Sequence, residues 1–390
     1  MKDGRTVSAE GSFLKLHAYL RSNDFRGYEF DDLLGSQIVN LLCGNSLLMK
    51  RIAIQAGELS PINLRPLLGV KKLESTKANG FFAKAYLTYY SATKDQRWLQ
   101  LAVDRLEWLR SHTSPGYSGI CWGNAFDFAS RGGYFPKGTP TIVWTAHIAD
   151  AFDLAYTITG NESYKDTIIG ICRFMMNDLE RREDEHGVCF AYAPGIVEPI
   201  HNSNLLGAST LLRGWRYCQD AAMRETAKRS YEWTLHFLNN DGSFYYGLGE
   251  KYQWIDNFHT AYNIDRLLIG HEIGGENIVP LSVIAKAYRF WVETFFLPDG
   301  TPKFYHNRVF PLDIQCAAQA IETLSKCHSL FPESRELSGR VVNWTIEHMQ
   351  KRNGSYRYQI RQFWKNDLES IHWGQSTMFA ALAQYLSVAD

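Results

Sequence analysis

The sequence has no excess of charge of either sign. Its 390 residues contain 41 lysines and arginines against 41 aspartates and glutamates, so the formal net charge at pH 7 is zero. Proteins that bind nucleic acids electrostatically need a surplus of positive charge, either overall or in a local patch. The sequence shows no run of like charges that would form such a patch. We therefore expect no nucleic-acid partner.

Long hydrophobic runs and secretory features are also missing. No 18 uncharged apolar residues follow one another, and the N-terminus lacks the basic start and apolar stretch of a signal peptide. These absences predict a cytoplasmic protein with no membrane span. The seven cysteines are odd in number, scattered and never spaced as C-x-x-C, a pattern typical of reduced, buried thiols rather than disulfides or structural zinc.

Several well-known catalytic motifs are absent too. The sequence has no H-E-x-x-H, G-x-x-x-x-G-K-[ST] or G-x-S-x-G motif, and no G-x-G-x-x-G at the start of a helix. This excludes the common signatures of zinc proteases, P-loop NTPases, α/β-hydrolases and Rossmann enzymes. A terpene cyclase would share an all-helical barrel, but no D-D-x-x-D or D-x-D-D run is present. We expect neither a cofactor nor a bound metal.

A repeat is present instead. A glycine followed by a short aromatic segment recurs at Gly119, Gly187, Gly242, Gly300 and Gly354, in steps of 68, 55, 58 and 54 residues. Such a period indicates a repeated helical unit. Amphipathic helices precede four of these glycines, and a second, more apolar set of helices alternates with them. The apolar set is predicted at 80–93, 145–160, 204–218, 258–273, 313–327 and 373–388.

Alternating apolar and amphipathic helices predict an all-α fold, an (α/α)6 barrel formed by one domain over residues 1–390, with short β-like turns after the outer helices. The apolar set would form the inner wall. The N-terminal segment 1–58, through a helix between Asp31 and Ala56, would supply the outer helix beside residues 373–388 and close the ring. An open solenoid is the alternative, although the apolar helices show no sustained polar face.

The loops that enter the inner helices are rich in aromatic and polar residues, and in a barrel they would face a common funnel. Aromatic faces that stack on sugar rings, with polar groups that bind hydroxyls, are suited to a carbohydrate. An Asp or Asn just before a helix can equally be an N-cap, as we consider for Asp313 and Asn204. The predicted substrate-binding residues are Trp122, Asn124, His147, Glu198, His201, Asn204, Tyr246, Trp254, Tyr262, Arg308, His372 and Trp373.

The segment WIDNFHTAYN contains the highest concentration of candidate catalytic and binding side chains. If a helix begins near Asn257, His259 and Tyr262 share one face and Asp256 lies at its mouth. This arrangement can donate and accept protons near neutral pH. The alternative is that Asp256 only caps the helix while His259 binds a neighbouring loop.

With these motifs, the sequence resembles the six-hairpin (α/α) barrel superfamily, which includes glycoside hydrolases, uronate lyases and sugar epimerases. From about Leu59, the runs SPINLRPLLGVKK, SGICWGNAFDF, FPKGTPTIVWTAH, WIDNFHTAYN and DGTPKFYHNRVFPLDIQCAAQAI also resemble an uncharacterised prokaryotic family associated with polysaccharide biosynthesis. The run around WIDNFHT is similar to a stretch of glucuronyl C5-epimerases, a resemblance that would give roles to Asp256, His259 and Thr260.

Three functions follow as hypotheses, each with an oligosaccharide or polysaccharide as the partner. The first is glycoside hydrolysis by paired carboxyl groups, with Asp127 and Asp256 as the pair and Glu198 in reserve. The second is uronate elimination or C5 epimerisation, with His259 and a tyrosine (Tyr246 or Tyr262) moving protons and Arg308 neutralising the uronate. The third is a barrel that binds a glycan without catalysis.

Overall fold

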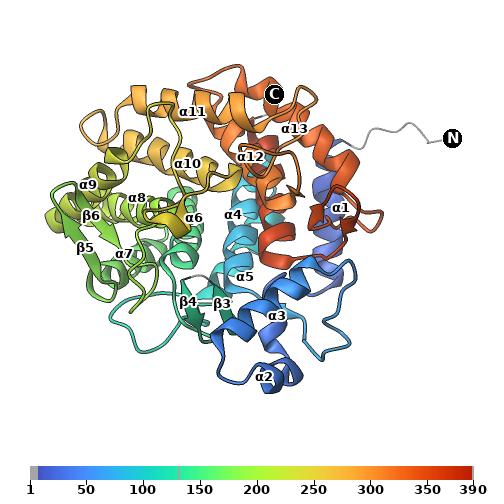
Figure 1. Ribbon diagram of the computed structural model, residues 1–390. Coiled ribbons are helices and arrows are strands. Elements are labelled where there is room, and N and C mark those ends of the chain that lie inside the picture. Colours follow the sequence, from blue (N-terminus) through green and yellow to red (C-terminus); the bar gives the residue numbers. More distant parts are fainter. Residues whose placement is uncertain (1–7, 131, 389–390) are drawn as a thin grey trace.

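The structure, a computed structural model, describes residues 8–130 and 132–388, and helices dominate it (Figure 1). Six helices surround the centre of the view, and a second set lies around them. The inner helices are α4 (Thr76–Thr93), α6 (Ile142–Thr159), α8 (His201–Cys218), α10 (Asn257–Gly274), α12 (Ile314–Cys327) and α14 (Ser376–Val388). Successive inner helices pack on one another, and α14 packs on α4, so the ring is closed. The predicted (α/α)6 barrel is confirmed.

The inner helices are buried on nearly all sides, as their apolar composition predicts. In α4, every residue from Lys77 to Tyr89 is buried, although this helix also carries two lysines. Small residues permit the close packing. A Cβ atom at Gly80 would come within 2.9 Å of Ile148 on α6, so the two helices meet where α4 has no side chain.

The outer helices bury one face each. In α11, the buried positions are Ile284, Ala287, Tyr288, Trp291 and Phe295, the same five residues that the helical spacing predicted. The outer set comprises α1 (Ala9–Ser22), α5 (Gln96–Arg110), α7 (Glu162–Asn177), α9 (Ala221–His236), α11 (Leu281–Phe295) and α13 (Ser334–Met349).

The helix that closes the ring is not the one predicted. Helix α1 packs on α14 and α13, although it lies at the opposite end of the chain (Figure 1). The predicted segment, Asp31 to Ala56, instead forms a 3-10 turn η1 (Asp32–Gly35) and helices α2 (Gln37–Cys43) and α3 (Leu47–Leu59), which pack on one another and on β3 (Phe128–Ser130). Both segments are apolar enough to cover the barrel. Helix α1 is one continuous helix of 14 residues that buries Phe13, Leu16 and Leu20, whereas the predicted segment is divided into three shorter elements.

The repeated glycines mark the same packing contact five times. A Cβ at Gly187 would lie 2.1 Å from the carbonyl oxygen of Arg229 in α9, because the turn after one outer helix presses on the backbone of the next. The other contacts run from Gly119 to α7, from Gly242 to α11, from Gly300 to α13 and from Gly354 to Lys15 of α1. The last contact identifies α1 as the outer helix that follows α13.

Replacing Gly187 by alanine is expected to lower the free energy of unfolding by about 2–3 kcal/mol, because the residue has φ +139° and no space for a Cβ. Gly160→Ala is the matched control. Gly160 also has positive φ, +66°, but nothing lies within 4 Å of its added Cβ, so only the backbone cost of about 1 kcal/mol is expected. Chemical denaturation of the two variants measures both values, and equal losses would refute the packing explanation.

The strands are short and antiparallel. The pairs are β1 (Arg26–Gly27) with β2 (Leu73–Glu74), β3 with β4 (Gly133–Phe135), β5 (Arg181–Asp184) with β6 (Gly187–Phe190), and β7 (Leu312–Asp313) with β8 (Gln359–Ile360) and β9 (Lys365–Asn366). Of the five glycine turns, only the one at Gly187 begins a regular strand. The segments after Gly119, Gly242 and Gly354 have one isolated bridge each, and the segment after Gly300 has three.

Polar side chains cap the N-terminal ends of the inner helices. Ser75, Thr141, Asp256 and Asp313 each accept a hydrogen bond from a backbone N–H in the first turn of α4, α6, α10 and α12. This end of the barrel therefore gathers polar groups, as the sequence predicted. Over the described residues, the structure contains no helix long and apolar enough to cross a membrane.

Candidate active site

Two cavities lie on either side of the first turn of α10. We call the larger one, of about 390 Å³, the Arg308 cavity; Phe258 and Trp373 belong to its wall. We call the other, of about 240 Å³, the His259 cavity. Its lining is mostly aromatic: Phe128, Phe135, Tyr192, Tyr246, Tyr252 and Trp254, together with Ser130, Gly132, Ile196, Glu198, Ile200 and His259. Phe258 and His259 are neighbours in sequence, so the start of α10 contributes a side chain to each cavity.

Asp256 and His259 form a hydrogen-bonded pair at this point. The Asp256 carboxylate caps α10 through one oxygen, which accepts the backbone N–H of His259 at 2.9 Å. Its other oxygen, Oδ2, lies 2.7 Å from Nδ1 of His259 and accepts the indole N–H of Trp254 at 2.8 Å. A carboxylate at Nδ1 favours the tautomer that carries its proton there, and this leaves Nε2 as the basic nitrogen.

The imidazole is the accessible member of this pair. The Asp256 side chain is 1% exposed, whereas that of His259 is 18% exposed and lines the His259 cavity. Asp256 is therefore both a cap and a partner of the histidine, and the two alternatives that the sequence left open are combined in one residue. A buried carboxylate that holds an accessible imidazole is the arrangement of a general base.

Aromatic rings surround His259 at stacking distance. Tyr246 and Trp254 are stacked with their ring centroids 4.4 Å apart, and Tyr246 lies 4.5 Å from His259. Burial raises the pKa of Tyr246 well above its ordinary value, and the neighbouring tyrosine Tyr192 and Asp256 raise it further. The Tyr246 hydroxyl therefore keeps its proton and can donate it to an oxygen that gains negative charge.

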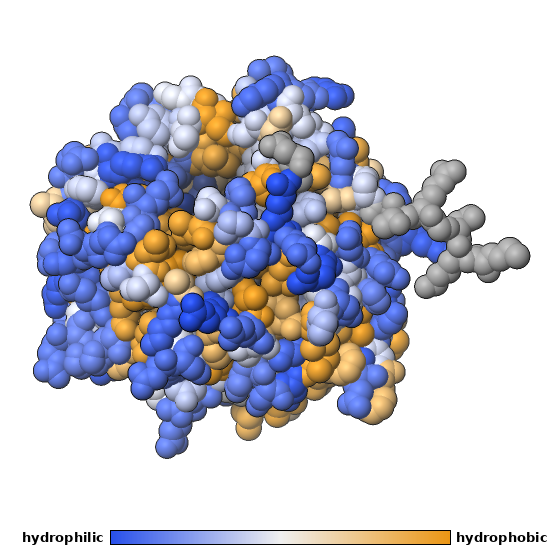
Figure 2. Space-filling model, turned by 90° about the horizontal axis from the view of Figure 1, so that it is seen from above, coloured by the Kyte–Doolittle hydropathy of each residue, from blue (hydrophilic) through white to orange (hydrophobic). Residues whose placement is uncertain are grey.

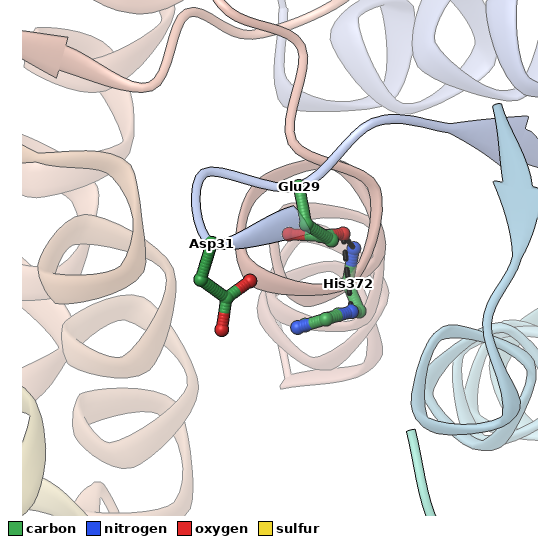
Figure 3. A group of neighbouring side chains, drawn as sticks. All are labelled: Glu29, Asp31 and His372. Carbon is green, nitrogen blue, oxygen red and sulfur yellow. Dashed lines mark hydrogen bonds and ion pairs between the residues drawn. The ribbon is translucent and has the colours of Figure 1, made fainter. Parts of the chain in front are cut away.

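A second carboxylate–histidine pair lies at the N-terminal end of the π-helical turn η3 (Ile371–Gln375), which precedes α14 (Figure 3). Nδ1 of His372 lies 3.1 Å from Oε1 of Glu29, and Glu29 also accepts the backbone N–H of His372 and the hydroxyl of Ser370. Burial raises the pKa of Glu29 well above its ordinary value, and burial with the nearby Lys77 lowers that of His372. The pair therefore holds one shared proton rather than two charges.

Asp31 completes this group from the same N-terminal loop. Its carboxylate lies beyond the end of the His372 ring that is remote from the backbone (Figure 3), and burial with the adjacent Asp32 raises its pKa to about 7. Within the described residues, these three side chains form the one group that places ligand atoms within 4.8 Å of one another, close enough to hold a metal ion. Oxygen and imidazole donors suit several divalent cations, but both Glu29 oxygens already accept hydrogen bonds from neutral groups.

Polar atoms from the inner helices converge on the axis below these pairs. The ammonium of Lys77 lies 3.3 Å from the ring centroid of Trp373 and 4.9 Å from that of Trp144, with no hydrogen-bond partner. Tyr262 accepts a hydrogen bond from Gln315 at 2.5 Å and lies 4.9 Å from His147. Buried polar atoms without a partner are rare in proteins; here they occur in Lys77, Trp144, His147, Asn263, Gln315 and His372.

The predicted carboxylate pair is not formed. Asp127 lies beside α2 in a different hollow, where it accepts hydrogen bonds from the Tyr134 hydroxyl at 2.8 Å and the Lys137 backbone at 2.6 Å. Asp256 is buried beside Trp254, and none of the described cavities contains both residues. The loop after Trp122 turns into the β3–β4 hairpin, and this carries Asp127 away from the start of α10.

Four other residues predicted to bind substrate have structural roles. Trp122 is fully buried and donates its indole N–H to the Leu109 carbonyl. Asn204 is also fully buried, and it donates to Val188, Ser230 and Thr234 while accepting the Phe190 N–H, so it joins α8 to its neighbours rather than capping it. His201 packs among Trp233, Phe237 and Phe244, and Asn124 is buried in the loop beside Trp122.

The remaining predicted residues line one of the two cavities or are buried in the barrel. Tyr246, Trp254 and Glu198 line the His259 cavity, where Glu198 also pairs with Lys251 at 2.8 Å. Arg308 and Trp373 line the Arg308 cavity, with the Arg308 guanidinium 4.2 Å from the ring centroid of Tyr305. His147 packs on Tyr262, and His372 packs on Trp144.

Sequence reasoning missed Glu29, Asp31 and Lys77. Lys77 had a detectable signal, because a lysine in an otherwise apolar inner helix must be buried. Glu29 and Asp31 had none, since nothing in the N-terminal segment shows that its loop reaches the barrel axis.

No protein-family profile matches the sequence, and no curated protein sequence is detectably similar to it. Solved structures are similar in three dimensions. A cellobiose 2-epimerase from Bacillus thermoamylovorans has a TM-score of 0.65 at 10% identity, covering 82% of this chain and 90% of the epimerase. A GH76 α-mannanase from Bacteroides thetaiotaomicron has a TM-score of 0.64 at 13% identity, covering 80% and 86%. The Lin0763 protein from Listeria innocua has a TM-score of 0.62 at 14% identity, covering 97% and 96%.

The chain therefore has the fold of the six-hairpin (α/α) barrels. At these identities the similarity establishes the fold alone, because barrels of this kind support different chemistries. The similar structures include an epimerase and a mannanase, so the reaction has to be argued from the side chains of this chain.

One residue of the Arg308 cavity should leave a pH signature. Burial raises the pKa of Asp313 to about 7, against an unfolded value near 4. Because the folded state holds this proton more tightly, the carboxyl group destabilises the fold increasingly as pH rises from about 4 to 8. Asp313→Asn keeps an oxygen that accepts the backbone N–H of Gln315. Its NH₂ group can also donate to the unpartnered Oε1 of Gln359 once the Gln359 side-chain amide flips. We expect the variant to gain stability relative to the wild type between pH 5 and pH 8 in thermal unfolding. A constant difference would contradict the raised pKa.

Proposed function

We propose that this chain is a carbohydrate-active enzyme that moves a proton on a sugar carbon next to a carbonyl group, as an epimerase or isomerase does. The observation that supports it is the Asp256–His259 pair, with a buried carboxylate at Nδ1 and an accessible imidazole in an aromatic cavity. Hydrolysis was our leading expectation from the sequence. It requires two carboxyl groups across the glycosidic bond, and Asp127 and Asp256 do not share a cavity.

The sugar ring would lie against Trp254 and Tyr246, because flat aromatic faces stack on the C–H faces of pyranoses. Nε2 of His259 would take the proton from the carbon beside the carbonyl, and the electron pair left by that C–H bond would move to the carbonyl oxygen. The Tyr246 hydroxyl would donate a hydrogen bond to this oxygen as its charge develops. Asp256 acts through the imidazole, so it is a positioning residue.

Return of the proton decides the product. Delivery to the opposite face of the same carbon gives the epimer. Delivery to the former carbonyl carbon, with a proton gained by the former carbonyl oxygen and lost from the neighbouring hydroxyl, which becomes the new carbonyl, gives the keto or aldo isomer. The Glu29–His372 pair is fully buried and lines neither cavity, so it has no assigned part in this step. Cytoplasmic location and a role in polysaccharide biosynthesis stay predictions from the sequence.

The experiment is a substrate panel read for three reactions at once. Reducing mono- and disaccharides and uronate oligosaccharides are incubated with the purified chain, and products are identified by proton NMR, ultraviolet absorption and reducing-end assay. We expect an epimer or a keto isomer from at least one carbohydrate, without new reducing ends. Release of reducing ends would replace this function by hydrolysis, an unsaturated uronate would replace it by elimination, and binding without turnover by a non-catalytic role.

A further inference from the structure

Apolar side chains are concentrated on an exposed surface formed by α2 and α3. Apolar groups reach the protein surface in patches elsewhere too, as Figure 2 shows for one face, and isolated ones need no explanation. However, ten of the nineteen large hydrophobic residues that are exposed in the described chain fall between positions 38 and 67. We call seven of them the α2–α3 surface: Ile38, Leu41, Leu42, Leu47, Leu48, Met49 and Ile52.

These side chains point away from the barrel because both helices use their other face for packing. Val39 and Cys43 of α2 and Ile54 of α3 are buried against the protein, whereas Leu41 is 84% exposed and Leu42 is 76% exposed. Along α3, the exposed positions Leu48, Ile52 and Leu59 continue the apolar stripe at helical spacing. The two helices are therefore apolar on both faces, and among the residues that the structure describes none covers the outer face.

Basic residues outnumber acidic ones around this surface, although Asp127 lines the same hollow as Ile38 and Glu58 follows the apolar stretch. Residues 33–57 contain no aspartate or glutamate, and their only charged side chains are Lys50 and Arg51. Lys71, which is exposed, lines a hollow together with Ile38, and Lys72 follows it in the sequence. Because the whole chain is neutral, this excess of positive charge is local. It is the patch that no run of like charges in the sequence revealed.

We propose that the α2–α3 surface docks on an anionic lipid bilayer, with its leucines at the boundary between headgroups and acyl chains and its basic residues on the lipid phosphates. Leucines on one face of a short helix with lysine and arginine beside them are typical of helices that lie in a membrane interface. A second copy of the chain fits less well, since a twofold interface would bring Arg51 and Lys50 close to their own copies.

The docked orientation places the candidate active site beside the lipid. Gln55, Glu58 and Leu59 at the end of α3 line the Arg308 cavity. The β8–β9 turn adjoins the same end of α3, because Asn366 donates to the Glu58 carbonyl at 3.0 Å, and this turn carries Phe363, 88% exposed, between Arg361 and Lys365. An aromatic tip flanked by basic residues is a second element suited to the headgroup region.

Vesicle cosedimentation tests the docking without reference to turnover, so its outcome is independent of the proposed reaction. The full chain is mixed with phosphatidylcholine vesicles containing phosphatidylglycerol and, separately, with pure phosphatidylcholine vesicles. We expect binding to the anionic vesicles and much weaker binding to the neutral ones. The double variant Leu41→Glu, Leu48→Glu should lower the partition coefficient at least about tenfold, since it removes two apolar groups and adds two negative charges.

Leu14→Glu is the matched control, because Leu14 is 43% exposed on α1 and lies outside this surface. It should bind like the wild type. If the leucine variant does not fold by circular dichroism, Arg51→Gln with Lys71→Gln replaces it and should remove the preference for anionic vesicles. Failure of the wild type to bind, or equal binding by all variants, would overturn the proposal. A dimer that the leucine variant abolishes, with no vesicle binding, would assign the surface to a second copy.

Discussion

Replacing Asp256 by asparagine is expected to lower kcat by about 100- to 10,000-fold while the protein stays folded. The amide keeps an oxygen for the backbone N–H of His259, so the cap of α10 is retained. Its NH₂ group, however, faces Nδ1 of His259 where Oδ2 was, and the imidazole must then carry its proton on Nε2. The base is lost because the histidine is held in the wrong tautomer.

Steady-state kinetics and thermal unfolding of this variant measure the two effects separately. Asp220→Asn is the matched control, since the Asp220 carboxylate caps the outer helix α9 and lines neither cavity. It should keep most of the activity. His259→Ala should be as inactive as Asp256→Asn, and the double variant should be little worse than either, because the two residues act as a unit. Full activity in Asp256→Asn with a large loss of stability would mean that Asp256 serves only the fold.

The largest effect on stability is expected at the opposite end of the inner helices. Asp150 of α6 receives two hydrogen bonds from Arg266 of α10, at 2.8 and 2.7 Å, and a further contact from Arg213 of α8. Although burial alone would raise the pKa of Asp150, these two guanidinium groups hold it well below its ordinary value. Asp150→Asn leaves the buried Arg266 without its ion-pair partner, while Arg213 keeps only its pair with Asp153 at 3.2 Å, and we expect a loss of about 3–5 kcal/mol in the free energy of unfolding.

The sign of the pH dependence follows from the lowered pKa. The folded state releases this proton more readily than the unfolded state, so the stabilisation is complete above about pH 5 and is lost progressively as pH falls from the unfolded pKa near 4 towards the lower folded pKa. The difference between wild type and Asp150→Asn in denaturant unfolding should therefore shrink at acidic pH. Asp95→Asn, at the exposed pair with Arg97, should leave the melting temperature unchanged. A similar small effect for both variants would contradict the role of the buried network.

The architecture could be predicted because it depends on patterns that repeat. The inner helices can be recognised from their apolar composition and the outer helices from the spacing of their apolar residues. The glycines recur with a period that the structure explains as a backbone contact with the next outer helix, as at Gly187 and Arg229. Ring closure was predicted for the helix between Asp31 and Ala56, whereas α1, which also belongs to the N-terminal segment 1–58, packs on α14 and α13. Both regions carry apolar residues at helical spacing, so the choice between them depends on tertiary packing that no local pattern describes.

The site was predicted where its residues are adjacent in sequence, as Asp256, His259 and Trp254 are. It was not predicted where distant segments meet. The Glu29–His372 pair joins residues 343 positions apart, and the supposed partner Asp127 is carried away by a hairpin whose path depends on tertiary packing. Trp122 and Asn204 were misread because an aromatic or amide side chain at a helix entrance satisfies a buried partner as readily as a ligand.

Solvent deuterium incorporation tests the central claim most directly. The substrate identified in the panel is incubated with the wild-type chain in D₂O, and both product and recovered substrate are examined by proton NMR at the carbon next to the carbonyl. Proton transfer through His259 predicts deuterium at that carbon with the wild type and none with His259→Ala. A product that forms with no deuterium at this carbon would contradict the account.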